Sequence, residues 1–354
     1  MRFPKFSGEW EICKVSELLD FYSTNSLSWE QLEYGEKAMM NLHYGLIHVG
    51  LPTMVDLRRD KLPNVKEGNM PKNFELCKEG DVAFADASED TNEVAKVIEL
   101  FNLDNKDIVC GLHTIHGRDN KNKTIVGFKG YAFSSSAFHN QIRRIAQGTK
   151  IYSISTKNFS ECYVGIPSKA EQTKIATLLR LIDERIATQN KIIEKLQSLI
   201  KGLNDNIHKG IKGETVCFSD LGEAYSGLSG KGGDDFGYGE PFITYMNVYQ
   251  NTYISEKDYE LVQIAPNEKQ NSVQYGDALF TLSSETPEEV GIGAVYLGNT
   301  QKLYLNSFCF GIHFYDERVL PQYLAHFISS SSFRRAIYPL AQGSTRFNLQ
   351  KNDF

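Results

Sequence analysis

The sequence predicts a mixed α/β fold in which two duplicated α/β domains are joined by a long coiled-coil helix. Short blocks recur in the same order at a shift of about 195 to 203 positions, and a heptad pattern lies between the two copies. A repeat of this length indicates a duplicated domain, because the units of solenoids are several times shorter. We therefore expect a first domain over residues 1–160, the helix over 161–212 and a second domain over 213–354.

The repeated blocks are short, so their shared order carries more weight than any one of them. The blocks and their counterparts are Ser16-Glu17-Leu18 and Ser219-Asp220-Leu221, Gly80-Asp81-Val82-Ala83-Phe84 and Gly276-Asp277-Ala278-Leu279-Phe280, Ser134-Ser135-Ser136-Ala137-Phe138 and Ser329-Ser330-Ser331-Ser332-Phe333, and Ala146-Gln147-Gly148-Thr149 and Ala341-Gln342-Gly343-Ser344. Two similar domains on one chain predict a bivalent reader of something that has two related sites.

Each copy is predicted to mix strands with helices. Branched and aromatic residues indicate strands, which we expect around each Gly-Asp pair and again later in each copy. The expected strands lie at 74–85, 108–115, 274–282 and 303–314. Helices are expected at 134–147 and 321–342, since the first begins with a possible serine cap and each ends near a glycine. The glycine-rich stretch 225–239 is expected to be a loop.

The region between the copies carries the clearest helical pattern in the chain. Apolar residues recur at alternating steps of four and three over more than four heptads, which is typical of a coiled coil. The seam consists of Ile175, Leu179, Ile182, Ile186, Ile193, Leu196, Ile200, Leu203 and Ile207, with Gln189 as its polar member. Ser168 and Glu171 resemble a capping box at the start of this helix. Packing on a domain core is the alternative, but the length and regularity of the seam favour a coiled coil.

Composition indicates ordered globular protein, with 41% hydrophobic and 12% aromatic residues. No apolar run is long enough to predict a membrane span, and no apolar signal segment follows Met1. The six cysteines are scattered without a CxxC motif, which indicates a reducing, cytoplasmic location. We expect them to be buried free thiols and expect no metal site.

Charge is segregated along the chain although the formal net charge is only −6. Residues 112–159 carry eight basic residues against one acid, about +7, and residues 213–300 carry three against fourteen, about −11. The segment 301–354 returns to about +3, from six basic and three acidic residues. A basic stripe on an acidic protein is compatible with a DNA-binding face, and an unevenly charged solvated surface is the equal alternative.

Motifs for catalysis are not found. Gly230-Lys231 fails as a phosphate-binding loop, because Tyr225 stands where the first glycine is required and Gly232 follows the lysine. No GxGxxG motif of a dinucleotide-binding site follows a strand and opens a helix, and the GxSxG motif of serine hydrolases is absent. His113 and His116 lack a third ligand at motif spacing, so ordinary roles are favoured over zinc binding. We therefore predict no catalytic residue and no bound cofactor.

The layout resembles the specificity subunit of type I restriction–modification systems. The opening Arg2-Phe3-Pro4-x-Phe6-x-Gly8-Glu9-Trp10 is similar to the start of that family, and the Gly-Asp turns are similar to its target-recognition domains. Ala146-Gln147-Gly148 followed by Pro167 and Glu171-Gln172 is similar to its passage from recognition domain into conserved helix. Together these motifs span most of the chain.

The resemblance implies a subunit that is not catalytic by itself. Each recognition domain would read one half of a split site on double-stranded DNA, and the conserved helix would set the spacing and dock methyltransferase subunits. S-adenosylmethionine, ATP and Mg²⁺ would be used by the methyltransferase and restriction (motor) subunits rather than by this chain.

One departure from the family concerns the second copy. Phe354 aligns with Phe159, so the family's second helix is not found after it. A fragment and a natural truncation both stay open. In either case we expect the seam of the helix to pair with another copy or with a methyltransferase helix, or to cause aggregation.

The DNA-contacting residues are expected in the later, basic part of each copy. The candidates are Arg118, Lys121, Lys123, Arg143, Arg144, Lys150, Arg334, Arg335 and Arg346. The first three are expected in one loop suited to phosphates. Arg334 aligns with His139, one helical turn before Arg143, so Arg143 and Arg334 are expected on the same helix face.

Two other classes of function stay open at this point. The chain could be a coiled-coil interaction scaffold whose duplicated domains bind protein or glycan. It could also be a self-sufficient enzyme with unrecognised motifs. Salt-sensitive DNA binding would separate DNA recognition from the scaffold, and methyl transfer by the chain alone would favour the enzyme.

Overall fold

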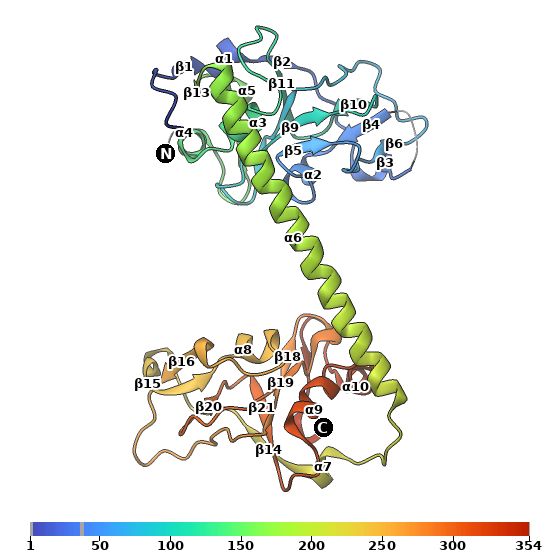
Figure 1. Cartoon of the computed structure of the whole chain (residues 1–354), viewed down its shortest axis with the longest axis vertical. Helices are drawn as coiled ribbons and strands as arrows, with labels where there is room; N and C mark the ends of the chain where they lie inside the picture. The colour runs from blue at the N-terminus through green and yellow to red at the C-terminus, as the bar shows by residue number, and fades with distance from the viewer. Residues whose placement is uncertain (1–2, 36–38, 354) are drawn as a thin grey trace. The chain divides into compact units, whose positions relative to one another are not determined.

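The computed structural model describes residues 3–35 and 39–353 (Figure 1). The chain divides into two compact units, unit 1 over Met1–Gln189 and unit 2 over Asn190–Phe354, and the division falls within one helix. Arg2 of the opening motif and Phe354, which aligns with Phe159, lie outside the described residues. Among the described helices, none has the length and apolar character needed to cross a membrane.

Unit 1 mixes strands with short helices, and its strands between residues 54 and 118 follow one another without a helix between them. Its strands are β1 (Glu11–Lys14), β2 (Asp20–Tyr22), β3 (Leu32–Glu33), β4 (Met39–Leu42), β5 (Met54–Asp56), β6 (Asn64–Val65), β7 (Val82–Ala85), β8 (Ala87–Ser88), β9 (Val97–Asn102), β10 (Asp107–Cys110), β11 (Thr114–Arg118), β12 (Tyr152–Ser153) and β13 (Tyr163–Ile166). Its helices are α1 (Val15–Leu18), η1 (Trp29–Gln31), α2 (Tyr44–His48), α3 (Lys129–Phe133), α4 (Ser136–Ile145), α5 (Thr156–Ser160) and the start of α6 (Lys169–Gly210).

Unit 2 contains the end of α6 and a similar mixture. Its strands are β14 (Gly222–Ser226), β15 (Phe236–Ile243), β16 (Tyr259–Val262), β17 (Ala278–Thr281), β18 (Ser283–Ser284), β19 (Gly293–Val295), β20 (Tyr304–Leu305), β21 (Cys309–Phe314) and β22 (Phe347–Asn348). Its other helices are α7 (Phe218–Leu221), η2 (Gly233–Asp235), α8 (Tyr245–Gln250), η3 (Glu256–Asp258), η4 (Pro287–Glu289), α9 (Pro321–Phe327), α10 (Ser331–Ile337), η5 (Tyr338–Leu340) and η6 (Lys351–Asp353).

The two units repeat one sheet topology. The main sheet of unit 1 has the order β2-β11-β7-β9-β5, and that of unit 2 has the order β14-β21-β17-β19, with antiparallel pairing at each matching position. The small antiparallel pair β8-β12 of unit 1 corresponds to β18-β22 of unit 2. Each unit also pairs two strands in parallel, β10 with β4 and β20 with β15. The predicted duplication of a mixed α/β fold is confirmed.

The Gly-Asp motif forms the same tight turn in both units. Gly80 and Gly276 adopt positive φ angles of 84° and 89°, and the following strand begins two residues later. The aspartate side chain closes the turn, because Lys78 N donates to Asp81 Oδ2 at 2.8 Å and Gln274 N donates to Asp277 Oδ2 at 2.8 Å. Both aspartates are buried. The motif is therefore a structural element of each unit rather than an exposed contact.

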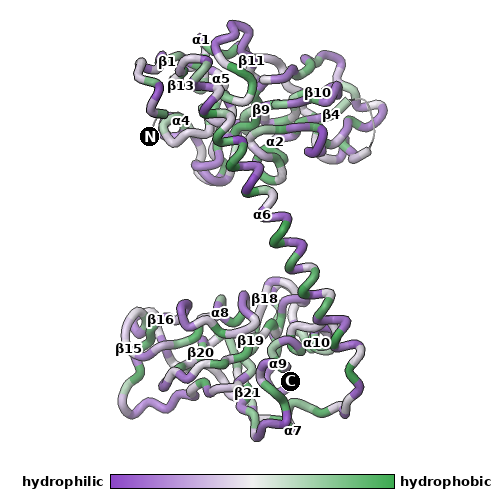
Figure 2. The backbone as a smooth tube through the Cα atoms, viewed as in Figure 1, coloured by the Kyte–Doolittle hydropathy of each residue, from purple (hydrophilic) through white to green (hydrophobic). Residues whose placement is uncertain are grey.

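The long helix is present as α6, and Ser168 accepts a hydrogen bond from Glu171 N at 3.3 Å at its start. The first turn belongs to the core of unit 1. The side chain of Gln172 is fully buried, accepts from Ile125 N at 2.9 Å and donates to Pro167 O at 2.9 Å. These bonds give Gln172 a structural role. In Figure 2 the tube of α6 changes repeatedly between hydrophobic and hydrophilic colours, as expected for an amphipathic helix.

The last turns of α6 pack on unit 2. Asn204 Nδ2 donates to His326 O at 2.8 Å, and Asp205 Oδ1 accepts from Ser331 N at 2.7 Å at the start of α10. The His208 ring lies 5.4 Å from the Tyr323 ring, centroid to centroid. These contacts make the end of α6 part of unit 2.

The helix begins at Lys169, directly after the predicted cap Ser168, because residues 163–166 form β13, which pairs with β1, and Pro167 follows. One expectation from the sequence was wrong. The stretch 225–239 is a loop only in its middle. Tyr225 belongs to β14, and its ring is buried and stacks on His313 with 4.0 Å between centroids.

A serine cap begins α4 within the helix expected over 134–147, as predicted, and an equivalent cap divides the helix expected over 321–342. Ser135 has an extended conformation and its hydroxyl accepts from Phe138 N at 3.3 Å, which separates α3 from α4. Ser330 does the same with Phe333 N at 3.3 Å, between α9 and α10. A serine that accepts from the backbone three residues later favours a helix start over a helix interior.

Candidate nucleic-acid interface

Unit 1 presents a short exposed loop directly after helix α4. We call residues 147–153 the first loop. It is closed by two backbone hydrogen bonds, from Gln147 N to Ser153 O at 2.9 Å and from Ser153 N to Gln147 O at 2.8 Å. Gln147, Thr149 and Lys150 are exposed between these bonds. Strand β12 pairs the loop with β8, which follows strand β7 of the main sheet in the chain.

Unit 2 presents the equivalent second loop, residues 342–348, after helix α10 and η5. Gln342 N donates to Asn348 O at 2.9 Å and Asn348 N donates to Gln342 O at 2.7 Å, which closes it in the same way. Ser344, Thr345 and Arg346 are exposed on it. Amide, hydroxyl and basic groups on a firmly held loop are suited to contact phosphates and base edges.

The shape of both loops requires glycine. Gly148 and Gly343 have φ angles of 138° and 141°, a region that L side chains rarely adopt. A Cβ at Gly148 would lie 1.9 Å from Ile151 O, and one at Gly343 would lie 2.0 Å from Arg346 O. The repeated Ala-Gln-Gly block of the sequence is therefore explained by one loop conformation that occurs in each unit.

Four of the predicted DNA-contacting residues are exposed on or near the two loops and their preceding helices. Arg144 and Lys150 in unit 1, and Arg335 and Arg346 in unit 2, are exposed. Arg143 is also exposed, and its guanidinium donates to Asn92 Oδ1 at 2.9 Å and to Asn140.

Lys121 and Lys123 lie in a turn that is tied to the first residues of unit 1. Lys121 Nζ donates to Glu17 O at 2.9 Å, and Lys123 Nζ forms an ion pair with Glu11 at 2.7 Å. The ion pair and neighbouring groups raise the pKa of Lys123. An exposed ion pair of this kind contributes little stability, so the Lys123 amine can exchange Glu11 for a phosphate. The bond of Lys121 to the Glu17 carbonyl is also exposed, so this amine can make the same exchange.

The expectation that Arg118 belongs to a phosphate-contacting loop was wrong. Arg118 is the last residue of β11 and its side chain is 8% exposed. Its guanidinium donates to both oxygens of Asp81 at 2.8 Å and to Glu75 at 2.7 Å. These bonds raise its pKa further above its ordinary value, despite burial. A buried arginine with two carboxylate partners holds the core together and cannot reach DNA.

The expectation that Arg334 is free on the surface to contact DNA was also wrong. Its guanidinium donates to the carbonyl oxygens of Gly291 at 2.7 Å, Glu288 at 2.7 Å and Val290 at 2.6 Å. Burial lowers its pKa. Arg334 therefore satisfies carbonyl groups of the 288–291 turn, whereas Arg143 stays exposed and bonds to Asn92 of the equivalent turn in unit 1.

One basic surface was not found from the sequence. A cavity of about 610 Å³ in unit 1 is lined partly by Arg58, Arg59, Lys61 and Lys106. Arg58 forms an ion pair with Asp56 at 2.5 Å, whereas Lys106 donates to Leu57 O at 2.9 Å. The four residues come from two segments more than 40 positions apart, so no local charge pattern could have revealed their proximity.

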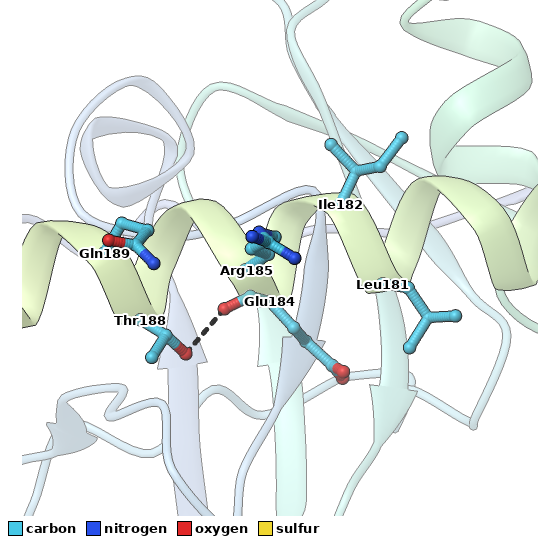
Figure 3. A pocket seen from close by; sticks show the side chains of 6 residues that line it. All are labelled: Leu181, Ile182, Glu184, Arg185, Thr188 and Gln189. Atoms are coloured by element: carbon cyan, nitrogen blue, oxygen red, sulfur yellow. Dashed lines mark hydrogen bonds between the residues drawn. The ribbon is translucent and has the colours of Figure 1, made fainter.

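Helix α6 carries the predicted partner interface. Ile175 packs on the first core of unit 1 and Leu179 is partly exposed. The exposed members of the seam are Ile182, Ile186, Ile193, Leu196, Ile200, Leu203 and Ile207, each between 44% and 62% exposed. In Figure 3 the side chains of Leu181 and Ile182 point in different directions from the helix, and the Thr188 hydroxyl bonds back to Glu184 O at 2.8 Å. The helix therefore exposes more apolar surface than a globular domain usually leaves to water.

Comparisons with known proteins agree with this architecture. Residues 60–198 match the family model of the type I restriction modification DNA specificity domain. The chain is 26% identical over 238 residues to the type I restriction enzyme EcoKI specificity subunit of Escherichia coli strain K12. That match covers 60% of this chain and 49% of the relative, so the chain spans about half the length of the curated protein that it matches.

Solved structures share the fold. The S subunit of a type I restriction–modification system from M. genitalium aligns with a TM-score of 0.51 at 14% identity, covering 96% of this chain and 82% of that chain. A chain from a study of complex assembly and conformational transition of the type I R-M system aligns with a TM-score of 0.52 at 13% identity, covering 98% and 87%. Residues 60–198 thus match the type I restriction modification DNA specificity domain, and the chain is similar in sequence and fold to specificity subunits of type I restriction–modification systems.

Proposed function

We propose that this chain is the DNA sequence-specificity subunit of a type I restriction–modification complex and that it has no catalytic activity of its own. The observation that carries the proposal is the specificity-domain match over residues 60–198 in a chain whose fold occurs twice. Each unit would read one half of a bipartite site on double-stranded DNA.

The two closed loops support this assignment. They have the same backbone geometry, yet the first carries Thr149 and Lys150 where the second carries Ser344 and Thr345, and Arg346 replaces Ile151. Base readout depends on which donors and acceptors reach the groove edge. Two loops of one shape with different side chains favour two unlike half-sites.

The partners and cofactors follow from the same proposal. The exposed seam of α6 would dock methyltransferase subunits, and restriction subunits would join the complex. S-adenosylmethionine, ATP and Mg²⁺ would be used by those subunits. Helix α6 would also fix the spacer between the half-sites.

The test is methylome sequencing of cells that co-express this chain with the methyltransferase subunit of its system. The expected result is adenine methylation at a split motif with two unlike halves. Exchanging Thr149-Lys150-Ile151 for Ser-Thr-Arg should alter recognition of one half only, and the reciprocal exchange at 344–346 should alter the other half only.

Three results would contradict the proposal. The first is a palindromic motif with identical halves. The second is methyl transfer by the purified chain alone. The third is no methylation from a complex that is shown to assemble and to contain folded chain. The loop exchanges serve as controls for each other, since they alter the same position of the fold.

A further inference from the structure

Two thiols and an imidazole lie together in the interior of unit 1. The Sγ atoms of Cys77 and Cys110 are 3.6 Å apart, and with a ring nitrogen of His116 all three ligand atoms lie within 4.8 Å of one another. The three residues are 5%, 1% and 1% exposed. Thiolate sulfur and imidazole nitrogen are the ligands that Zn²⁺ takes in proteins. We propose that Cys77, Cys110 and His116 bind a zinc ion that stabilises unit 1.

The fold brings these residues together from three segments. Cys77 N donates to Ile108 O at 2.8 Å, which holds the segment before β7 against β10. Cys110 is the last residue of β10, and His116 lies in β11 opposite Ala83. Since Cys77 and Cys110 are 33 positions apart, no CxxC motif marks the cluster. The sequence-based expectation of unconnected thiols missed it for that reason.

The distance between the sulfurs suits a metal ion better than a disulfide. A disulfide needs sulfur atoms about 2.05 Å apart, so its formation would require both side chains to move. Tetrahedral zinc, with zinc–sulfur bonds of about 2.3 Å, places two sulfur ligands about 3.8 Å apart. The observed 3.6 Å is close to that separation.

His116 is arranged like a metal ligand with an orienting carboxylate. Its Nε2 lies 2.7 Å from Asp81 Oδ2, and the carboxylate thus favours the tautomer with a proton on Nε2. Within the described residues, the buried Nδ1 atom has no hydrogen-bond partner. Histidines that bind metal commonly donate their other ring N–H to a carboxylate. A metal ion would satisfy the Nδ1 atom, whose burial is otherwise unfavourable.

Charge balance also favours a divalent cation. Two thiolates and a neutral imidazole around Zn²⁺ have no net charge, which suits a buried position. The neighbouring Asp81 is already paired with Arg118 at 2.8 Å. Binding would release both thiol protons to solvent.

In unit 2 the three equivalent positions carry residues that cannot bind a metal ion. The bond from Cys77 N to Ile108 O corresponds to Val273 N to Leu303 O at 2.7 Å, so Val273 is equivalent to Cys77. By the same register, Leu305 is equivalent to Cys110 and Gly311 to His116. The shared topology therefore forms without the cluster, and the residues of unit 2 define conservative replacements.

The test uses the full chain, purified without chelator under reducing conditions. Zinc content measured by inductively coupled plasma mass spectrometry should be about one ion per chain. The C77V and C110L variants, which carry the residues of unit 2, should lose this zinc while keeping the wild-type circular dichroism spectrum. The control C309V removes a buried thiol of unit 2 and should retain the zinc.

Two further measurements test the metal site by spectroscopy and by thermal stability. Replacement of zinc by Co²⁺ should give thiolate charge-transfer bands and the intense d–d bands of tetrahedral cobalt, and both should be absent in C77V. Added Zn²⁺ should raise the melting temperature of chelator-treated wild type but not that of C77V. DNA plays no part in these measurements, so their outcome is separate from that for the proposed function.

Any of three outcomes would overturn the proposal. One is reduced wild-type chain that binds no zinc on titration and shows no change in melting temperature. Another is a Cys77–Cys110 disulfide found by peptide mapping of the chain as isolated from cells. The third is zinc content that is the same in C77V and wild type, which would place the metal elsewhere.

Discussion

The guanidinium of Arg118 forms a two-pronged bond with the carboxylate of Asp81, from Nε to Oδ1 and from Nη2 to Oδ2, both at 2.8 Å. In unit 2 the equivalent Asp277 accepts instead from Tyr225 at 2.7 Å, and its Oδ1 lies 2.9 Å from His313 Nδ1. The buried aspartate of each Gly-Asp turn is thus held from the neighbouring strands, although the partners differ. The repeated aspartate is therefore a buried hydrogen-bond acceptor in both units, and only the folded structure shows which side chains bond to it.

Replacing Asp81 with asparagine should destabilise unit 1 strongly. The change leaves Arg118 buried with only Glu75 as a carboxylate partner, and breaking a buried ion pair costs about 3–5 kcal/mol. We expect a loss near the lower end of that range because Glu75 stays. Urea unfolding followed by tryptophan fluorescence would measure it, as Trp10 and Trp29 both lie in unit 1. The control D104N, at an exposed pair with Lys106 in the same unit, should leave the midpoint unchanged.

The same carboxylate predicts a pH dependence. Burial by itself would raise the pKa of Asp81, but hydrogen bonds from His116 and Arg118 outweigh it and hold the pKa below its ordinary value of 3.8. A lowered folded pKa contributes stability that is present above pH 3.8 and is lost as pH falls through the folded value. The stability difference between wild type and D81N should therefore shrink below about pH 4. An unchanged difference down to pH 2 would contradict this.

The loop glycines should not tolerate alanine. Both G148A and G343A put a Cβ against a carbonyl oxygen at a positive φ, and such strain costs about 1–3 kcal/mol. We expect reduced methylation by the complex and a lower melting temperature for each variant. G202A is the matched control, because a Cβ there meets nothing within 4 Å and helix interiors favour alanine by about 0.5–1 kcal/mol.

The exposed basic residues of the loops should act through phosphate contacts. K150A and R346A should each weaken DNA binding by the assembled complex across sequences, and each should reduce the slope of log affinity against log salt by about 1. Fluorescence anisotropy over a salt series would measure both effects. The exposed Lys72 and Lys257 provide controls, and K72A and K257A should leave the slope unchanged. Equal slopes for all four variants would exclude the loops as the interface.

The apolar seam of α6 should determine partner binding. Leu196 and Ile200 are 52% and 62% exposed, and burial of such a side chain contributes on the order of 1.5–3 kcal/mol. The double variant L196N/I200N should lose co-purification with the methyltransferase subunit while the circular dichroism spectrum keeps its helical signal. K195N, at a neighbouring exposed position, should co-purify normally. Full retention by the double variant would show that this part of the seam is not the docking surface.

The sequence by itself determined the duplication, the mixed α/β class and the long helix. These features depend on local or repeated patterns. The Gly-Asp turn needs a glycine with positive φ, the Ala-Gln-Gly loop needs another, and the seam of α6 needs apolar residues at heptad steps. Each of these patterns depends on the type and spacing of residues along the chain, so it could be recognised before the fold was known.

Only the tertiary structure decided which charged residues face solvent. Arg118 and Arg334 are basic residues in basic segments, and nothing local distinguishes them from Arg144 or Lys150. Their burial depends on carboxylate and carbonyl groups that are about 40 residues away in the sequence.

The cluster of Cys77, Cys110 and His116 was hidden for the same reason. Strand pairing sets which side chains meet across a sheet, and a register is fixed by the whole core rather than by either strand alone. The sequence therefore indicated that unit 1 has thiols and histidines, while the pairing of β10, β11 and the segment before β7 decided that three of them lie within 4.8 Å.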